Sequence, residues 1–195
     1  MTQLSLPLCQ NHDDIIQATR QWLEVAVIGL NLCPFAKAVR VRNQIRYVVS
    51  DAANSATLLT ELINELQALT EIDAALIDTT LLIHPCVLSD FLDYNDFLCT
   101  ADLMLNKLKL NGILQIASFH PHYQFSGNGP DDIENYTNRS PYPMLHILRE
   151  DSIDRAVAAV PDAAAIFARN IDTLKQLGHN GWNALGIHGD RKMKR

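Results

Sequence analysis

The middle of the chain alternates three short runs of strand-forming residues with two segments of helical periodicity. The three runs are rich in β-branched and aromatic side chains and lie at residues 45–50, 79–84 and 113–119. Between them, apolar residues recur every three or four positions at residues 58–69 and 97–108. This alternation predicts strand-helix-strand units, whose crossover connections favour a parallel core.

Helical segments are also expected on both sides of this alternation. The apolar residues within 15–30 fall on one helical face, and two aspartates just before them favour the start of a helix. Residues 144–148 predict a fourth short strand, followed by helices at residues 152–160 and 162–177. We therefore predict an α/β (or α+β) fold with about four strands in a mixed sheet built from βαβ units, flanked by helices, with N- and C-terminal helices packing on it.

The length and charge of the chain limit the classes of protein that it can represent. Its 195 residues suffice for one domain, which we place at residues 13–180 between a flexible N-terminus (1–12) and a flexible basic tail (181–195). The net charge of −6 argues against nucleic-acid binding, which requires a basic face. Because no signal-peptide pattern and no membrane-length apolar run occur, we expect a cytoplasmic protein without a membrane partner.

Two consecutive predicted strands end in a His-Pro pair, at His84 and at His120. If these strands are parallel, both imidazoles lie at the carboxyl edge of the sheet, where ligands bind in open α/β folds. They would then serve as general acid/base groups or metal ligands, and Asp93 or Asp96 would orient one of them. An alternative of equal weight is that each pair only ends its strand, with the imidazole hydrogen-bonded to a nearby carbonyl.

His122 lies two residues after His120, so in extended backbone the two side chains project to the same side. Metal sites use this spacing, and we consider a divalent transition metal bound by His84, His120 and His122. A solvent-exposed His122 without a ligand role is the more frequent outcome.

A long connection follows the third strand, and such loops are usually functional or disordered. Within it, Tyr123, Gln124 and Asn138 would orient a substrate by hydrogen bonds. Arg139 would hold a carboxylate or phosphate through both ends of its guanidinium, or would instead form an ion pair that pins the loop. His146, inside the fourth strand, is expected to be half-buried and hydrogen-bonded rather than a ligand.

The residues around Cys33 suggest a thiol site. The sequence CPFAKA resembles the active-site turn of glutaredoxin-like proteins, with Ala36 in place of the second cysteine. A thiol at a helix N-terminus has a lowered pKa, so Cys33 would act as a monothiol nucleophile. Against this hypothesis, a thioredoxin-type arrangement has a strand directly before the cysteine, whereas residues 15–30 have helical periodicity.

Five phrases, GLNLCPFAKAV, TTLLIHP, DYNDFL, ASFHPHYQF and TNRSPYPMLHILRE, together resemble an uncharacterised bacterial family, the domain-of-unknown-function family 1415. The resemblance spans roughly residues 13–178. Sequence phrases of this length are specific for a family. It implies a similar fold and a soluble bacterial protein, and it transfers no activity. The polar members of the shared phrases are Cys33, His84, Asp93, Asn95, His120, Tyr123, Gln124, Asn138, Arg139 and His146. Because His122 is less characteristic, the resemblance favours His84 paired with His120.

These observations lead to three functional hypotheses. The first is an enzyme acting on a small polar or anionic substrate, in which His84 and His120 are the acid/base groups or metal ligands and Arg139 anchors the anion. The second is a monothiol redox or metal-carrying protein centred on Cys33. The third is a noncatalytic binding or assembly module, including a homo-oligomer, with residues 119–150 as its interface.

Overall fold

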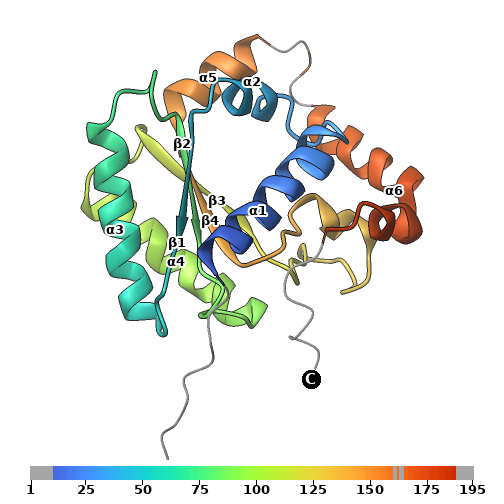
Figure 1. Cartoon of the computed structure of the whole chain (residues 1–195), viewed down its shortest axis with the longest axis horizontal. Helices are drawn as coiled ribbons and strands as arrows, with labels where there is room; N and C mark the ends of the chain where they lie inside the picture. Colours follow the sequence, from blue (N-terminus) through green and yellow to red (C-terminus); the bar gives the residue numbers. More distant parts are fainter. Residues whose placement is uncertain (1–10, 160–161, 163–164, 188–195) are drawn as a thin grey trace, which may run out of the picture.

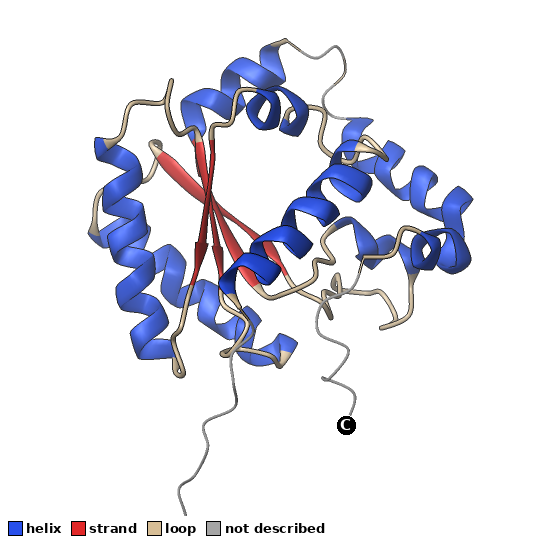
Figure 2. Ribbon diagram, in the orientation of Figure 1, coloured by secondary structure: helices blue, strands red, loops and turns tan. Residues whose placement is uncertain are grey.

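In the part of the chain that the structure describes, four strands form one mixed sheet in the order β1-β2-β4-β3. The computed structural model describes residues 11–159, 162 and 165–187. The strands are β1 (Ile45–Val49), β2 (Thr79–Ile83), β3 (Leu114–Phe119) and β4 (Met144–Arg149). The helices are α1 (His12–Trp22), the π-helical η1 (Leu23–Ile28), α2 (Ala36–Val41), α3 (Ser55–Glu71), α4 (Phe91–Lys107), the 3-10 helix η2 (Ile133–Thr137), α5 (Glu150–Ala158) and α6 (Ile166–Ala184). The α/β fold with a four-stranded mixed sheet that the sequence predicts is confirmed (Figure 2).

The direction of the strands follows from their connections. β1 and β2 are parallel, with α3 between them in the chain, whereas β4 runs antiparallel to both of its neighbours, β2 and β3. β3 therefore runs in the same direction as β1 and β2, although β4 separates it from them. The long connection after β3 contains no helix that crosses back over the sheet, so β4 begins at the edge where β3 ends.

Each face of the sheet carries its own apolar core. Because strand side chains alternate, Leu82 of β2 packs with the helices α3 and α4, while its neighbours Leu81 and Ile83 pack with α1. We call these surfaces the α4 face and the α1 face (Figure 1). None of the described helices is both long and apolar enough to cross a membrane.

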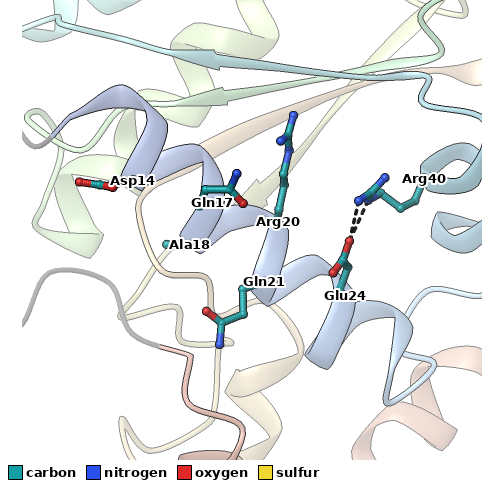
Figure 3. Close-up of a pocket in the computed structure, with 7 residues that line it drawn as sticks. All are labelled: Asp14, Gln17, Ala18, Arg20, Gln21, Glu24 and Arg40. Carbon is teal, nitrogen blue, oxygen red and sulfur yellow. Dashed lines mark hydrogen bonds and ion pairs between the residues drawn. The ribbon is translucent and has the colours of Figure 1, made fainter.

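Helix termini match the local sequence signals in part. The Asn11 side chain caps α1 by accepting a hydrogen bond from the Asp13 backbone N–H. The single predicted helix at residues 15–30 changes to π-helical turns at η1, and Arg40 of α2 reaches Glu24 of η1 in an ion pair of 2.6 Å (Figure 3). This ion pair joins two segments that are separated by an irregular turn.

The last helix extends beyond the predicted domain boundary at residue 180. Gly178 has a positive φ of 62° that interrupts α6, yet the chain resumes helical structure to Ala184, and Trp182 is buried in the core of the α1 face. Residues 1–10 of the predicted flexible N-terminus and residues 188–195 of the predicted tail lie outside the described residues.

Candidate functional site

The two strand-end histidines lie at one edge of the sheet, as the sequence predicts. His84 follows β2 and His120 follows β3, and these strands run in the same direction, so both residues lie at the carboxyl edge. The ring of Tyr94, from α4, lies 5.8 Å from the His84 ring and 5.0 Å from the His120 ring, measured between centroids. All three side chains are fully buried. We call these three residues the histidine-tyrosine cluster.

His84 has one nitrogen engaged and one open. Its Nδ1 lies 3.0 Å from the carbonyl oxygen of Val87, and because a carbonyl only accepts, Nδ1 carries the proton. Nε2 is then the basic nitrogen, and it is buried with no hydrogen-bond partner among the described residues. Burial lowers the pKa of His84 to about 4, so the imidazole is neutral at neutral pH.

His120, in contrast, has both nitrogens engaged. Nε2 donates to the carbonyl of Leu88 at 3.2 Å, and Nδ1 accepts from the backbone N–H of His122 at 3.0 Å. Burial also lowers the pKa of His120 to about 4. Each imidazole thus bonds a nearby carbonyl, as expected if the His-Pro pairs only end their strands. Of the two histidines, His84 alone keeps a ring nitrogen with a free lone pair.

The turn between β2 and α4 is held by these two imidazoles. They bond the carbonyls of Val87 and Leu88, and Leu88 has a positive φ of 57°. A bulky residue in this conformation stores about 1–3 kcal/mol of strain, and such strain concentrates at functional sites. Asp90 ends the turn by capping α4, since its Oδ1 accepts from the N–H groups of Leu92 and Asp93.

The predicted metal ligands do not converge in this arrangement. The rings of His120 and His122 lie 5.8 Å apart, but both nitrogens of His120 are engaged in hydrogen bonds and the His122 side chain is exposed. Over residues 11–159, 162 and 165–187, no group of three His, Cys, Asp or Glu side chains is placed to hold a metal ion. The metal-ligand role of His84, His120 and His122 remains a prediction.

The predicted substrate-binding residues lie in the loop beside the cluster, and their polar groups mostly bond backbone. Tyr123 packs on Phe91 at 5.2 Å between centroids, next to His120. Gln124 donates to the carbonyl of Asn128, and Asn138 donates to the carbonyl of Ser118 at 3.1 Å. These contacts order the loop, and Tyr123 is the member that borders the cluster.

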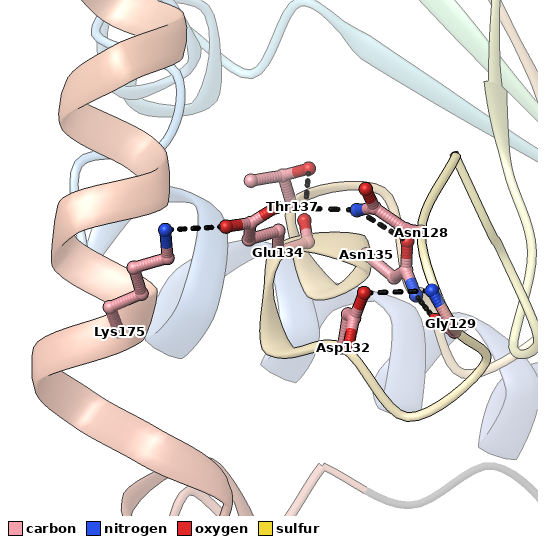
Figure 4. Close-up of polar contacts among 7 residues, drawn as sticks. All are labelled: Asn128, Gly129, Asp132, Glu134, Asn135, Thr137 and Lys175. Atoms are coloured by element: carbon pink, nitrogen blue, oxygen red, sulfur yellow. Dashed lines mark hydrogen bonds and ion pairs between the residues drawn. The ribbon is translucent and has the colours of Figure 1, made fainter. Parts of the chain in front are cut away.

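Polar side chains within the loop explain why it is ordered. The buried Asn135 accepts from the N–H of Phe125 at 3.0 Å and donates to the carbonyl of Gly129 at 2.8 Å. Glu134 forms an ion pair of 2.6 Å with Lys175, which ties the loop to α6 (Figure 4). Nothing in the sequence marks Asn135, because several loop residues carry amides and the sequence does not indicate which of them becomes buried.

Tyr94 is the functional candidate that the sequence analysis missed. Asp93 and Asp96, which the sequence offers as partners of a histidine, are both exposed, and neither bonds the imidazole of His84 or His120. Tyr94 contacts both imidazoles instead, and its hydroxyl donates to the carbonyl of Met144 at 2.8 Å and accepts from the N–H of Phe119 at 3.1 Å. Its place in the helical spacing 94, 97, 101 and 105 indicates only that it faces the core.

Comparison with known proteins gives one match. The family model described as "Protein of unknown function (DUF1415)" matches residues 14–184. The chain belongs to the DUF1415 family. Searches of curated proteins and of solved structures found no significant match. The matched region includes the histidine-tyrosine cluster and the whole loop beside it, so both are parts of the DUF1415 domain.

Cys33 lies apart from the cluster in this DUF1415 domain. It packs against the core of the α1 face, whereas Tyr94 of the cluster belongs to the core of the α4 face. The expectation of a lowered pKa is wrong: burial raises the pKa of the Cys33 thiol, and the nearby backbone N–H groups of Phe35 and Ala36 offset this only in part. The segment before Cys33 is helical, as its periodicity predicts.

His146 has the half-buried, hydrogen-bonded environment that its position in a strand predicts. Its Nε2 lies 2.7 Å from the Thr79 hydroxyl, which itself donates to the carbonyl of Ile147. Nε2 therefore donates to the Thr79 oxygen. Removal of the ring from water lowers the pKa of His146 to about 4.

Arg139 pins the DUF1415 loop through carbonyl groups. Its Nε donates to the carbonyl of Tyr123 at 3.3 Å, its Nη2 donates to the carbonyl of Pro130, and its Cζ lies 4.2 Å from the centroid of the Tyr136 ring. Within the described part of the chain Arg139 forms no ion pair, so the expected bridge to a carboxylate is absent.

We expect Arg139→Lys to destabilise the protein. Lysine keeps the charge but cannot bond two divergent carbonyls and stack on a ring at once, so the free energy of unfolding should fall by about 1–2 kcal/mol. Urea denaturation followed by circular dichroism measures this change. The control is Arg169→Lys, at an exposed position of α6. Equal stabilities of the two variants would show that the contacts of Arg139 do not hold the loop.

Proposed function

We propose that this protein is an enzyme that acts on a small polar or anionic substrate at the carboxyl edge of the sheet, with His84 as its general base. The observation that carries the proposal is the buried Nε2 of His84, which has no partner among the described residues. The carbonyl of Val87 fixes the proton on Nδ1, which presents Nε2 as the proton acceptor. A buried polar atom without a partner is costly, and a substrate hydroxyl, amine or acid would satisfy it.

The lowered pKa of His84 favours an anionic substrate. With a pKa of about 4 the imidazole is neutral at pH 7 but only weakly basic. A negative charge placed beside the ring favours its protonated form and so raises the pKa toward the working pH. An anionic substrate would thereby strengthen the base that it needs, whereas a neutral substrate would not.

Access to His84 requires movement of the turn between β2 and α4. The carbonyl of Val87 in this turn bonds the imidazole, and the neighbouring Leu88, which has a positive φ, is bonded by His120. Release of Leu88 to negative φ would relieve the strain and break that one bond. In this proposal His120 is a positioning residue that sets the balance between the closed and open turn, and Tyr123 borders the opening.

The other two hypotheses have different support. A thiolate nucleophile at Cys33 needs a lowered pKa, and burial acts in the opposite direction. Burial of the thiol therefore weighs against a nucleophile at Cys33. A noncatalytic binding module remains the alternative outcome of the experiment below. The proposal assigns the protein to the cytoplasm, with a small molecule rather than nucleic acid or a membrane as its partner.

The test combines ligand screening with substitution of His84. We expect members of a panel of small carboxylates, phosphate esters and amino acids to raise the melting temperature of the wild-type protein and of the control His122→Gln. His84→Gln should lose the response, and conversion of the bound compound should slow by about 10²–10⁴-fold, the usual contribution of a general base.

Two outcomes would contradict this assignment. If His84→Gln keeps both the thermal response and the conversion of the compound, His84 is not the base. If compounds bind to the wild-type protein and none is converted, the protein is a binding module and not an enzyme. Proton chemical shifts of the imidazoles distinguish a lost base from a misfolded variant.

A further inference from the structure

Ser50 lies beside His84 at the carboxyl edge of the sheet. β1 and β2 are parallel, with Val49 opposite Ile83, and the backbone N–H of Ser50 donates to the carbonyl of Ile83 at 2.8 Å. This bond continues the ladder by one residue, so Ser50 is opposite His84 on strands whose backbones lie about 5 Å apart. The chain separates the two residues by the whole of α3, which hides the pairing in the sequence.

Both side chains belong to the α4 face. Along β1, Val48 packs with the core of the α4 face and Val49 with that of the α1 face, so the alternation brings the next residue, Ser50, to the α4 face. The ring of His84 stacks on that of Tyr94 from α4. Ser50 is only 2% exposed and His84 is fully buried. The hydroxyl and the imidazole therefore share the buried side of the sheet that α3 and α4 cover.

Ser50 has a proton to donate and His84 has a lone pair to accept one. The Ser50 oxygen accepts from the backbone N–H of Ala52 at 3.0 Å, which uses a lone pair and leaves the hydroxyl proton. The Nε2 atom of His84 is buried without a partner among the described residues, so the two side chains do not bond each other in this closed form. Hydrogen bonds between catalytic groups often tighten only when substrate is bound.

The amino end of α3 gives this region a partial positive charge. α3 begins shortly after Ser50, and the peptide dipoles of its 17 residues add along its axis. Its cap is the neutral Asn54 and its first turn holds no acidic residue, whereas the carboxylate of Asp90 caps α4. Asp51 is exposed and bonds His12 at 2.9 Å. The amino end of α3 therefore favours negative charge that develops on a substrate oxygen near Ser50.

We propose that Ser50 is the nucleophile of the site in which His84 is the base, and that the substrate is a small ester. This inference rests on the proposed function of His84. The Ser50 oxygen bonds to the carbonyl carbon, its proton passes to Nε2 of His84, and the carbonyl electrons move to the oxygen, beside the amino end of α3. The alcohol then leaves with the proton from Nε2. Water attacks the acyl-serine in the same way and releases the acid.

The experiment labels the full chain with a fluorophosphonate, whose phosphorus bonds to a nucleophilic serine oxygen as fluoride leaves. Mass spectrometry of the tryptic peptides locates the adduct, which we expect on Ser50. Ser50→Ala should give no adduct, and His84→Gln should slow labelling by about 10²–10⁴-fold, because the base is lost.

A chromogenic ester tests the same serine by turnover. With p-nitrophenyl acetate, the wild-type protein should release a burst of about one equivalent of nitrophenol per chain as the acyl-serine accumulates. Ser50→Ala should lose the burst. Ser50→Cys, which keeps a nucleophile of similar size, should retain it, and this rescue separates loss of the nucleophile from loss of the fold.

Ser140 provides the matched control within the same chain. It is also buried, but its hydroxyl proton is donated to the carbonyl of Tyr142 at 2.7 Å. Ser140→Ala should therefore be labelled at Ser50 as the wild type is.

Three outcomes separate the nucleophile from the base. Absence of an adduct on Ser50 in the folded wild-type protein would overturn the nucleophile. Conversion of a compound that depends on His84 but is unchanged in Ser50→Ala would also overturn it, and would leave the base intact. Labelling of Ser50 at an equal rate in His84→Gln would support the nucleophile and contradict the base.

Discussion

Acidification from pH 7 to pH 5 is expected to lower the free energy of unfolding by several kcal/mol. His84, His120 and His146 each have a pKa of about 4 in the folded protein, below the ordinary histidine value of 6.5. The unfolded chain therefore takes up protons below pH 6.5, while the folded protein does not until about pH 4. The stabilisation is complete above pH 6.5 and is lost as the pH falls toward 4, by about 2 kcal/mol per histidine at pH 5.

Urea denaturation at a series of pH values measures this loss. A domain of this size is stable by only about 5–15 kcal/mol, so the expected change is a large fraction of the total. His146→Gln and His84→Gln should each reduce the loss of unfolding free energy between pH 7 and pH 5 by the contribution of one histidine. His122→Gln, at an exposed site, serves as the control. A stability that is constant between pH 7 and pH 5 would show that the three imidazoles are not kept neutral by the fold.

Removal of the Tyr94 ring is expected to have the largest effect of any single substitution in the cluster. The ring is fully buried and packs against both imidazoles, so Tyr94→Ala leaves a cavity and should lower the free energy of unfolding by about 3–5 kcal/mol. Tyr94→Phe keeps the ring and removes the hydroxyl that links the carbonyl of Met144 to the N–H of Phe119. Its cost should be about 1–3 kcal/mol, because both backbone groups lose their partner.

Chemical denaturation of the two variants separates packing from hydrogen bonding. Tyr123→Ala removes an equal ring that is only partly buried, and it should cost less than Tyr94→Ala. The link through the hydroxyl would be disproved if Tyr94→Phe were as stable as the wild type. It would also be disproved if the amide resonance of Phe119 stayed unchanged in that variant.

The strands and the two strand-end histidines could be predicted because their signals are local. β-branched runs specify β1, β2 and β3, and the repeated His-Pro ending places His84 and His120 at one edge once the strands run in the same direction. The position of β4 between β2 and β3 could not be predicted. It depends on the path of the long loop that precedes β4 and not on residues 144–149 themselves.

Burial and backbone conformation explain most of what the sequence does not reveal about the site. Cys33 precedes a helix, which favours a thiolate, but the surrounding core raises its pKa, and no local pattern reports that core. Leu88 adopts a positive φ in a turn that is bonded by the nearby imidazole of His84 and by that of His120, 32 residues further along the chain, and no local pattern reports the second contact. Tyr94 has the periodicity of any core residue, so its contacts with both imidazoles become visible only in three dimensions.

The place of β4 constrains how the protein is made on the ribosome. β4 is the last of the four described strands in the sequence, yet it is the strand that bonds both β2 and β3. Until β4 has left the exit tunnel, β2 and β3 each have an unpaired edge, and the backbone N–H of His84 lacks the carbonyl of Pro143 that it bonds in the folded protein. The sheet, and with it the cluster, therefore closes only after residue 149 has been translated.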